Sequence, residues 1–310
     1  MAFPVPLLLT FHLQSSDPWR LKFYILLGLV AYSWWLLAIV LSVRPPWLDR
    51  LVGLRSIYGL HGMLGVLALA AAYVHGENSY APERWARWLG DWSFYAALTV
   101  LCYSVFFMSG WLVDRSMLLV KVKRLLERVF RHQLSVWIHR LNLVIVGMIW
   151  LHAHLLDRVS EHFVFMVLFD LYTVVVLGIY AWKKWIGPDT FKAGTVVANH
   201  ARGGSTRKVS VALDQEETSL RPGDFFFLSF EGSSAVSRER HPFSVTDDNR
   251  EEVTFTMRQH GNYTRRLGNV QAGTRVRLEG PFGRFDSIVQ DHHKTRRSCS
   301  SEWAPAWRRC

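Results

Sequence analysis

The sequence predicts a bundle of membrane-spanning helices followed by a small antiparallel β-barrel. Before about Trp185 it contains five apolar runs, each near the twenty residues that a helix needs to cross a bilayer. Beyond Gly187 and Pro188 the apolar runs become short, and Gly, Asp and Asn separate them. Half of the 310 residues are hydrophobic, which suits a chain that combines a membrane part with a soluble part.

Five spans are expected in the membrane part. Their predicted bounds are Leu21–Val43, Ser56–Val74, Trp92–Val113, Trp137–Leu156 and His162–Trp182. The first dozen residues are too few to span, and we interpret them as an interfacial piece of an N-terminal segment, residues 1–20. They lack the charged start and the small-residue cleavage pattern of a signal peptide.

Two of these spans carry histidines at matched depths. His61 and His75 are fourteen residues apart, and His139 and His152 are thirteen apart. At about 100° and 1.5 Å per residue, the first spacing puts two imidazoles within about 40° on one face and about 21 Å apart along the axis. Two such helices side by side offer two histidine pairs, which is what bis-imidazole ligation of two b-type haems requires. A single histidine can be a hydrogen-bonded interface residue, but four at matched depths favour haem.

The second of these helices leaves one ligand open. In a straight helix His139 and His152 would be about 220° apart, whereas His139 and His154 would be about 60° apart. Either a distortion at Gly147 rotates the far end of the helix, or His154 is the ligand. Spacing alone leaves both alternatives standing.

The formal net charge of +11 follows membrane topology, and we expect no nucleic-acid partner. The connection from Asp114 to Gln133 carries six basic residues against two acidic ones, which places it on the cytoplasmic side. The connection from Gly76 to Asp91 is close to balanced and suits the outer side. We therefore expect a multi-pass protein of the cell membrane, surrounded by lipids, with a cytoplasmic barrel. Parallel histidine helices then pair His61 with His139 near the cytoplasm and His75 with His152 near the outer face.

Six short runs predict the barrel. They are Thr195–Asn199, Lys208–Leu213, Phe225–Phe230, Phe243–Thr246, Val253–Arg258 and Arg275–Leu278. Six strands in about ninety residues are typical of a small closed antiparallel barrel.

Three pieces of the barrel have chemistry that suits a flavin. Arg240–Thr246 is predicted to be a rigid turn leading into a strand, which presents an aromatic ring, hydroxyls and backbone N–H groups to the isoalloxazine. Arg258–Leu267 combines cations with a glycine turn, and a helix beginning near Thr264 would add a positive field for a pyrophosphate. Gly280–Gly283 is predicted to be a turn that a ligand can approach closely. The three cysteines show no metal-binding spacing.

The membrane histidines followed by His-Pro-Phe-Ser, Gly-Asn-Tyr-Thr and Gly-Pro-Phe-Gly resemble the ferric reductase and NADPH oxidase superfamily of transmembrane flavocytochromes b, over roughly residues 20 to 286. The resemblance implies two b haems and an FAD in a ferredoxin-reductase-type barrel. It favours His152 over His154, because the family uses the thirteen-residue step. The implied haem ligands are His61, His75, His139 and His152. The implied FAD residues are His241, Pro242, Phe243, Ser244 and Thr246 for the isoalloxazine strand, and Arg258 and Thr264 for the pyrophosphate.

The implied function is electron transfer from NAD(P)H through FAD and two haems to an acceptor such as ferric iron or dioxygen, with the cofactors carrying the chemistry and no catalytic side chain expected. One alternative is a haem-binding membrane subunit fed by a separate reductase. Another is an inactive truncated product.

The predicted domains are 21–185 for the haem-binding part, 187–286 for the barrel and 287–310 for an aberrant tail. In the family an α/β NAD(P)H-binding domain follows the Gly-Pro-Phe-Gly turn, but only 25 residues follow Phe285 here. Reading Cys299–Cys310 one frame over permits a glycine-rich nucleotide loop, so we hypothesise a frameshift. Sequencing the gene through this region tests the hypothesis, and finding no nicotinamide-domain coding after the stop would reject it.

Overall fold

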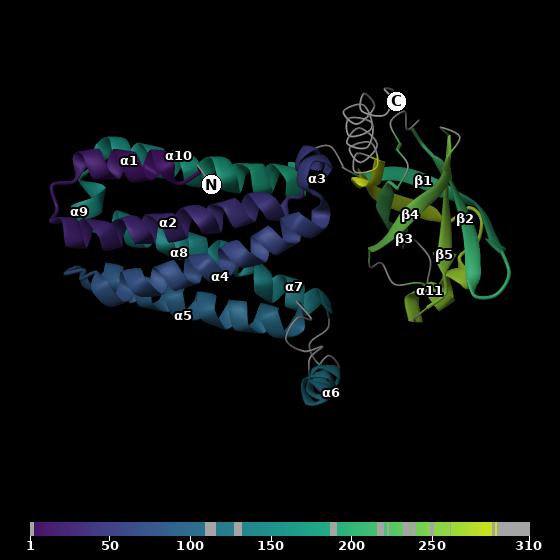
Figure 1. Ribbon diagram of the computed structural model, residues 1–310, viewed down its shortest axis with the longest axis horizontal. Coiled ribbons are helices and arrows are strands. Elements are labelled where there is room, and N and C mark those ends of the chain that lie inside the picture. The colour runs from purple at the N-terminus through teal and green to yellow at the C-terminus, as the bar shows by residue number, and fades with distance from the viewer. Residues whose placement is uncertain are drawn as a thin grey trace, which may run out of the picture. The chain divides into compact units, whose positions relative to one another are not determined.

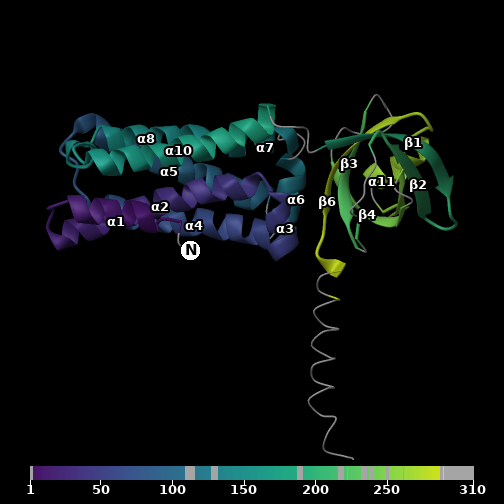
Figure 2. The same ribbon diagram turned by 90° about the horizontal axis from the view of Figure 1, so that it is seen from above.

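The computed structural model describes residues 3–108, 116–126, 132–186, 191–215, 220–221, 223–231, 236, 240–248, 251–260, 262–286 and 289. It divides the chain into two compact units, whose helices and strands are labelled in Figures 1 and 2. The helical unit comprises Met1–Val43 and Tyr58–Trp185, and the barrel unit comprises Arg44–Ile57 and Ile186–Cys310. The predicted linker at Gly187 and Pro188 and the tail expected at 287–310, apart from position 289, lie outside the described residues.

Helices dominate the first part of the chain. In order they are α1 (Val5–Gln14), α2 (Trp19–Ser42), α3 (Pro46–Val52), α4 (Leu54–Asn78), α5 (Arg84–Phe107), α6 (Met117–Leu126), α7 (His132–Arg140), α8 (Asn142–His154), α9 (Asp157–Ser160) and α10 (Phe163–Ala181). Among the described residues, five stretches are long and apolar enough to cross a membrane: Trp19–Ser42, Leu54–Asn78, Arg84–Phe107, Leu134–His154 and Phe163–Trp185. The prediction of five apolar helices before a barrel is confirmed.

The third span begins and ends earlier than its apolar pattern predicts. The predicted range was Trp92–Val113, whereas α5 runs from Arg84 to Phe107. The first two turns of α5 carry Arg84, Arg87 and Asp91, which lower the local hydropathy without preventing a helix. Charged side chains at a helix end can extend toward the membrane surface, so the hydrophobic run and the helix need not coincide.

The fourth span is interrupted at Leu141. The Leu141 N–H donates to the Ile138 carbonyl at 3.0 Å, which is a tight i to i−3 bond, and the Asn142 side-chain amide donates to the His139 carbonyl at 2.8 Å. The distortion predicted at Gly147 is therefore at Leu141, and α8 continues through Gly147. The angle calculated for one straight helix does not apply to His139 and His152, because they lie on α7 and α8 respectively.

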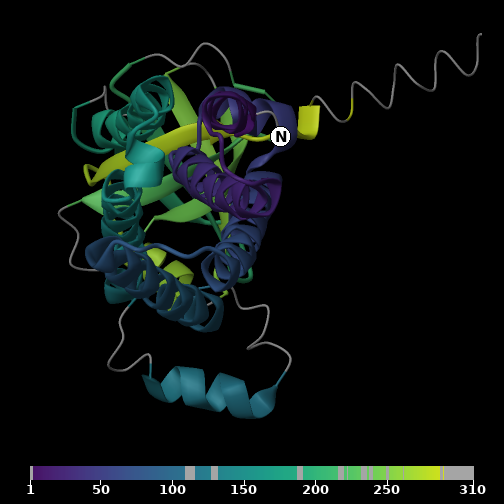
Figure 3. The ribbon, with the colours of Figure 1, turned by 90° about the vertical axis from the view of Figure 1, so that its left-hand side faces the viewer.

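The long helices run alongside one another, as Figures 1 and 2 show, and α6 lies crosswise to them in Figures 1 and 3. α1 packs against α2 and α10. Its Leu7 and Phe11 are fully buried in a core that also contains Leu36 of α2 and Phe165 of α10. The segment that we interpreted as interfacial thus contributes to the core of the helical unit.

The second part of the chain forms a closed barrel of six antiparallel strands, as predicted. The strands are β1 (Phe191–Ala201), β2 (Thr206–Leu213), β3 (Phe225–Glu231), β4 (His241–Asp248), β5 (Glu252–Arg258) and β6 (Arg275–Phe282), in the spatial order β1-β2-β5-β4-β3-β6. Because strand side chains alternate, Phe226, Leu228 and Phe230 of β3 point inward and are fully buried. Gly280–Phe282, which we expected in a turn, form the end of β6.

Candidate functional site

The first histidine pair joins α4 to α7. The rings of His61 and His139 have centroids 5.8 Å apart. Nδ1 of His61 lies 2.9 Å from the Ala38 carbonyl oxygen, and Nδ1 of His139 lies 2.9 Å from the Ser104 hydroxyl. That hydroxyl donates a hydrogen bond to the Val100 carbonyl, so it accepts a hydrogen bond from the Nδ1–H of His139.

The second pair joins α4 to α8. The ring centroids of His75 and His152 are 6.5 Å apart, with the planes at 88°. Nδ1 of His75 lies 2.8 Å from the Tyr24 carbonyl oxygen, and Nδ1 of His152 lies 2.7 Å from the Ala86 carbonyl oxygen. The structure therefore brings the four predicted histidines together in the two predicted pairs.

These hydrogen bonds favour the same tautomer in all four imidazoles, with the proton on Nδ1. An Nδ1 that donates to a carbonyl or hydroxyl oxygen leaves the lone pair on Nε2, which is the atom free to bind a metal. Two metal–imidazole bonds of about 2.1 Å on opposite sides of one ion, with half a ring added at each end, separate the centroids by about 6.5 Å. The second pair, at 6.5 Å, matches this spacing for one iron between two rings, and the first pair, at 5.8 Å, is shorter.

His154 has a different environment. Its Nδ1 lies 2.9 Å from the Trp150 carbonyl oxygen, and its Nε2 lies 3.3 Å from Oδ1 of Asp170. Asp170 also accepts a hydrogen bond of 2.7 Å from the Trp150 indole. Both ring nitrogens of His154 are thus engaged by protein atoms, so the geometry favours His152 as the partner of His75.

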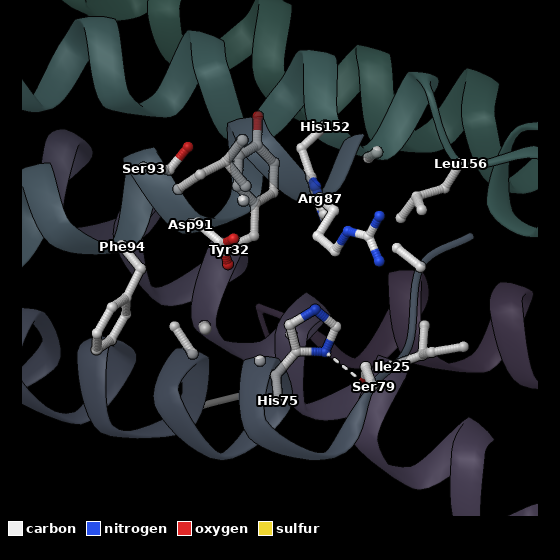
Figure 4. A pocket seen from close by; sticks show the side chains of 18 of the residues that line it. Ile25, Tyr32, His75, Ser79, Arg87, Asp91, Ser93, Phe94, His152 and Leu156 are labelled. Atoms are coloured by element: carbon white, nitrogen blue, oxygen red, sulfur yellow. Dashed lines mark hydrogen bonds between the residues drawn. The ribbon is translucent and has the colours of Figure 1, made fainter. Parts of the chain in front are cut away.

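A cavity of about 680 Å³ surrounds the second pair. Figure 4 shows His75 and His152 entering it from opposite sides, and a dashed line marks the 3.2 Å contact between His75 and Ser79. Two glycines make room for the rings. A Cβ on Gly28 would lie 2.8 Å from Nδ1 of His75, and a Cβ on Gly90 would lie 3.0 Å from the His152 ring. The volume lies in the range of about 300–1,000 Å³ typical of cofactor pockets.

Charged side chains also line this cavity, and the sequence analysis did not identify them. They are Glu77, Glu83, Arg87, Asp91 and Arg158. Figure 4 shows Arg87 directed into the cavity, and its guanidinium lies 5.8 Å from the centre of the Tyr80 ring. No group of three or more His, Cys, Asp or Glu side chains suited to a metal ion occurs in the described part of the chain. A haem needs only two such side chains, so this does not conflict with the histidine pairs.

The predicted flavin residues of the barrel divide between the two faces of β4. Phe243 and Val245 pack against the barrel core, so the aromatic ring expected to be presented to a flavin is half-buried. Pro242, Ser244 and Thr246 are exposed on the other face. Alternation along a strand explains this division, because neighbouring side chains point to opposite faces.

The two ends of the predicted flavin site meet through an aromatic contact. His241, the first residue of β4, stacks on Tyr263 with ring centroids 3.7 Å apart. Tyr263 belongs to α11 (Asn262–Arg266), which begins two residues before the position predicted for it. The side chain of Thr264 accepts a 2.8 Å hydrogen bond from the His260 N–H. This stacking brings the predicted isoalloxazine segment, Arg240–Thr246, into contact with the predicted pyrophosphate segment, Arg258–Leu267.

The predicted pyrophosphate residues lie beside the exposed face of β4. Arg258 is exposed at the end of β5, next in the chain to the loop that leads to Thr264. The hydroxyls of Thr246 and Thr256 are 3.0 Å apart and link β4 to β5. Gly261, the glycine of the predicted turn, lies outside the described residues. The surface thus offers hydroxyl groups and a cation to a ligand.

Residues 193–287 match the family model described as "Oxidoreductase FAD-binding domain". No curated protein matches the chain. One similar solved structure is a ferredoxin reductase in carbazole 1,9a-dioxygenase, 20% identical over 30% of this chain and 30% of that chain, with a TM-score of 0.27. Another is the flavohemoglobin from Malassezia yamatoensis with bound FAD and heme, 10% identical over 92% of this chain and 65% of that chain, with a TM-score of 0.29.

Proposed function

We propose that this chain, whose residues 193–287 form an FAD-binding oxidoreductase domain, is a transmembrane flavocytochrome b of the ferric reductase and NADPH oxidase type. One observation carries the proposal: four imidazoles in apolar helices form two pairs, and each directs Nδ1 to a hydrogen-bonding oxygen. Bound haem and FAD would supply one-electron and two-electron chemistry respectively.

The helices have the task of holding two irons at two depths. His61 and His139 would bind the inner haem, and His75 and His152 the outer haem. The hydrogen bonds to Nδ1 orient each ring and make Nε2 the more basic ligand atom, as outer-shell partners do in other metal sites. Of the charged side chains that line the outer cavity, Arg87 and Arg158 are suited to the two ionised propionates of a haem or to an anionic acceptor.

The barrel has the task of holding FAD. Pro242, Ser244 and Thr246 would face the isoalloxazine, with hydroxyl and backbone groups available to its polar atoms. Arg258 and Thr264 would hold the pyrophosphate, to which a guanidinium offers several donors. His241 and Phe243 would support this surface from behind, because one stacks on Tyr263 and the other contacts the barrel core.

Electrons would enter on the cytoplasmic side and leave outside the cell membrane. NAD(P)H is the proposed donor, and ferric iron or dioxygen are examples of the acceptor. The excess of Lys and Arg between α5 and α7 supports a cytoplasmic position for that connection and therefore for the barrel. Adding NAD(P)H and FAD to the purified chain distinguishes a self-sufficient enzyme from a subunit that needs a separate reductase, because only the former reduces its own haem.

Cofactor quantitation tests the central proposal. The purified full-length chain should carry two b haems and bind one FAD, and both haems should appear in a reduced-minus-oxidised spectrum. A folded chain that binds FAD but no haem would reject the flavocytochrome and leave a membrane-attached flavoprotein.

A further inference from the structure

A short segment between two membrane helices belongs to the barrel unit. We call Arg44–Gly53 the clamp; it contains α3 and connects α2 to α4. α3 packs against β6. In this contact Asp49 of the clamp and Asp224 of the barrel are each 1% exposed. Burying a carboxylate is costly unless it is paired and hydrogen-bonded, so their partners identify what the clamp does.

Arg50 forms the main link to the barrel. Its two terminal nitrogens donate to the two carboxylate oxygens of Asp224, at 2.5 and 2.9 Å, and one of them also donates to the Gly283 carbonyl at 3.0 Å. Hydrogen bonding to Asp224 raises the pKa of Arg50. The same carboxylate accepts a 2.9 Å bond from the Arg221 N–H, so it also shapes the loop that enters β3.

Asp49 binds the other polar group of the same glycine. The Gly283 N–H donates to its carboxylate at 2.9 Å. Gly283 has φ +137°, a conformation that favours glycine, and a Cβ there would lie 2.9 Å from the Gly223 carbonyl oxygen. The clamp therefore holds both backbone polar groups of the last residue of the Gly-Pro-Phe-Gly motif, at a point with no room for a side chain.

The clamp has a second attachment near the start of β4. Arg44 forms a 2.6 Å ion pair with Glu279, which also pairs with Arg240 at 3.2 Å. The Arg44 guanidinium lies 5.4 Å from the centre of the Phe227 ring. Arg44 is the non-glycine residue with a positive φ among those described, at +52°, a conformation that is unfavourable for a residue with a Cβ. Because Arg240 immediately precedes His241, this attachment ends at the predicted isoalloxazine strand.

We propose that the clamp is a positioning element for FAD, which fixes the Gly280–Gly283 segment through Asp49 and Arg50 and the start of β4 through Arg44 and Glu279. This inference rests on the proposed FAD site. A buried ion pair is weak support for stability, and Oδ1 of Asp49 is buried without a hydrogen-bond partner among the described residues, so we assign the clamp a role in position and not in stability. The clamp leads directly into α4, where His61 follows Gly53 by eight residues. Linkage is reciprocal, so FAD binding must also order the clamp if the clamp strengthens FAD binding.

The first experiment compares two Arg–Asp pairs in the full-length chain by titration with FAD. Arg50→Met should weaken FAD binding about tenfold, within the usual range of coupling between sites. Arg275→Met is the matched control. Arg275 in β6 also donates two hydrogen bonds to one carboxylate, that of Asp214, at 3.0 and 2.6 Å, but this pair is exposed. Its loss should change affinity by less than about twofold. Equal effects of the two substitutions would overturn the proposal.

The second experiment separates positioning from charge. Asp49→Asn keeps an oxygen that can accept the Gly283 N–H and should retain FAD affinity within about twofold, whereas Asp49→Leu removes the acceptor and should weaken binding about tenfold. Unchanged affinity in both variants would reject a role for Asp49. The haem spectrum of each variant reports whether the helical unit is folded.

Hydrogen exchange on the wild-type chain requires no variant. Adding FAD should slow amide exchange in peptides that cover the clamp and Gly283, and should leave peptides from β1 and β2 unchanged. If FAD binds and the exchange of the clamp stays the same, the clamp proposal fails while the FAD site stands. If no FAD binds to the wild-type chain, the proposed function of the barrel itself fails.

Discussion

The oxygen that faces Nδ1 decides what each membrane histidine can do. In His75 and His152 this oxygen is a backbone carbonyl of a neighbouring segment, and the centroids of the two rings are 6.5 Å apart. In His154 the Nε2 atom also has a protein partner, the carboxylate of Asp170. Two histidines only two residues apart therefore have different chemistry, and their contacts rather than their spacing distinguish them.

Substituting these two histidines should have different consequences. His152→Ala should lower the haem content from two to about one per chain, because the outer iron loses one of its two axial ligands. His154→Ala should retain both haems. Haem extracted per folded chain measures the difference, and equal losses in the two variants would contradict the assignment of His152.

Glycines make room for the outer imidazoles, so adding a methyl group at one of these glycines should displace the neighbouring imidazole. Gly90→Ala places a Cβ 3.0 Å from the His152 ring and should shift the midpoint potential of the outer haem or reduce its occupancy. Gly65→Ala is the control, because a Cβ at that helical position meets nothing within 4 Å. Both substitutions improve helix propensity by a similar amount, so a difference in redox titration isolates the contact with His152.

At the scale of elements, the side chains of β4 alternate between the barrel core and the exposed face proposed to contact FAD. Its inward-facing side chains join the barrel core, and its outward-facing hydroxyls remain exposed. β5 lies alongside and ends at Arg258, and α11 supplies Tyr263 to stack on His241. The proposed flavin surface would therefore be made by three elements that are consecutive in the chain, so its residues could be proposed from one stretch of sequence.

The charge at the end of β5 should matter for FAD more than other surface charges. Arg258→Gln should weaken FAD binding by about 1.5–3 kcal/mol, the usual contribution of a hydrogen bond to a charged group. The loss should shrink as salt is added, because an exposed charge is screened. FAD titrations at two ionic strengths measure this, with Arg275→Gln as the control. A variant that binds FAD as the wild type does would remove Arg258 from the site.

At the scale of the whole molecule, the two units have separate cores. The helical core is formed around Leu36 and Phe169, and the barrel core around Phe226 and Phe255. These two clusters share no residue. Stability in each unit is therefore expected to depend on its own packing.

A cavity in one core should leave the other intact. Phe226→Ala, at a fully buried position, should cost the barrel about 3–5 kcal/mol and abolish FAD binding at a temperature where the wild type binds it. The haem spectrum should persist in the same sample. Val197→Ala, on an exposed part of β1, is the control and should have little effect. Loss of haem together with FAD would show that the two cores unfold as one.

The periodicity of the chain was enough to predict five apolar helices, six barrel strands and two histidine-bearing spans. These features follow from side chains close together in sequence, which is why they can be predicted without a structure. Some bounds differ from the prediction: charged residues in the first turns of α5 hide the start of that helix, and the fourth span is divided into α7 and α8.

Only the tertiary structure decided which histidine faces His75 and where the segment after α2 belongs. The first choice depends on the break at Leu141 and on oxygens supplied by Ala86 and Asp170. The second depends on Arg50 and Asp224, which are 174 positions apart in the chain. Contacts over such separations leave no periodic pattern in the sequence, because each is made by individual side chains that folding alone brings together.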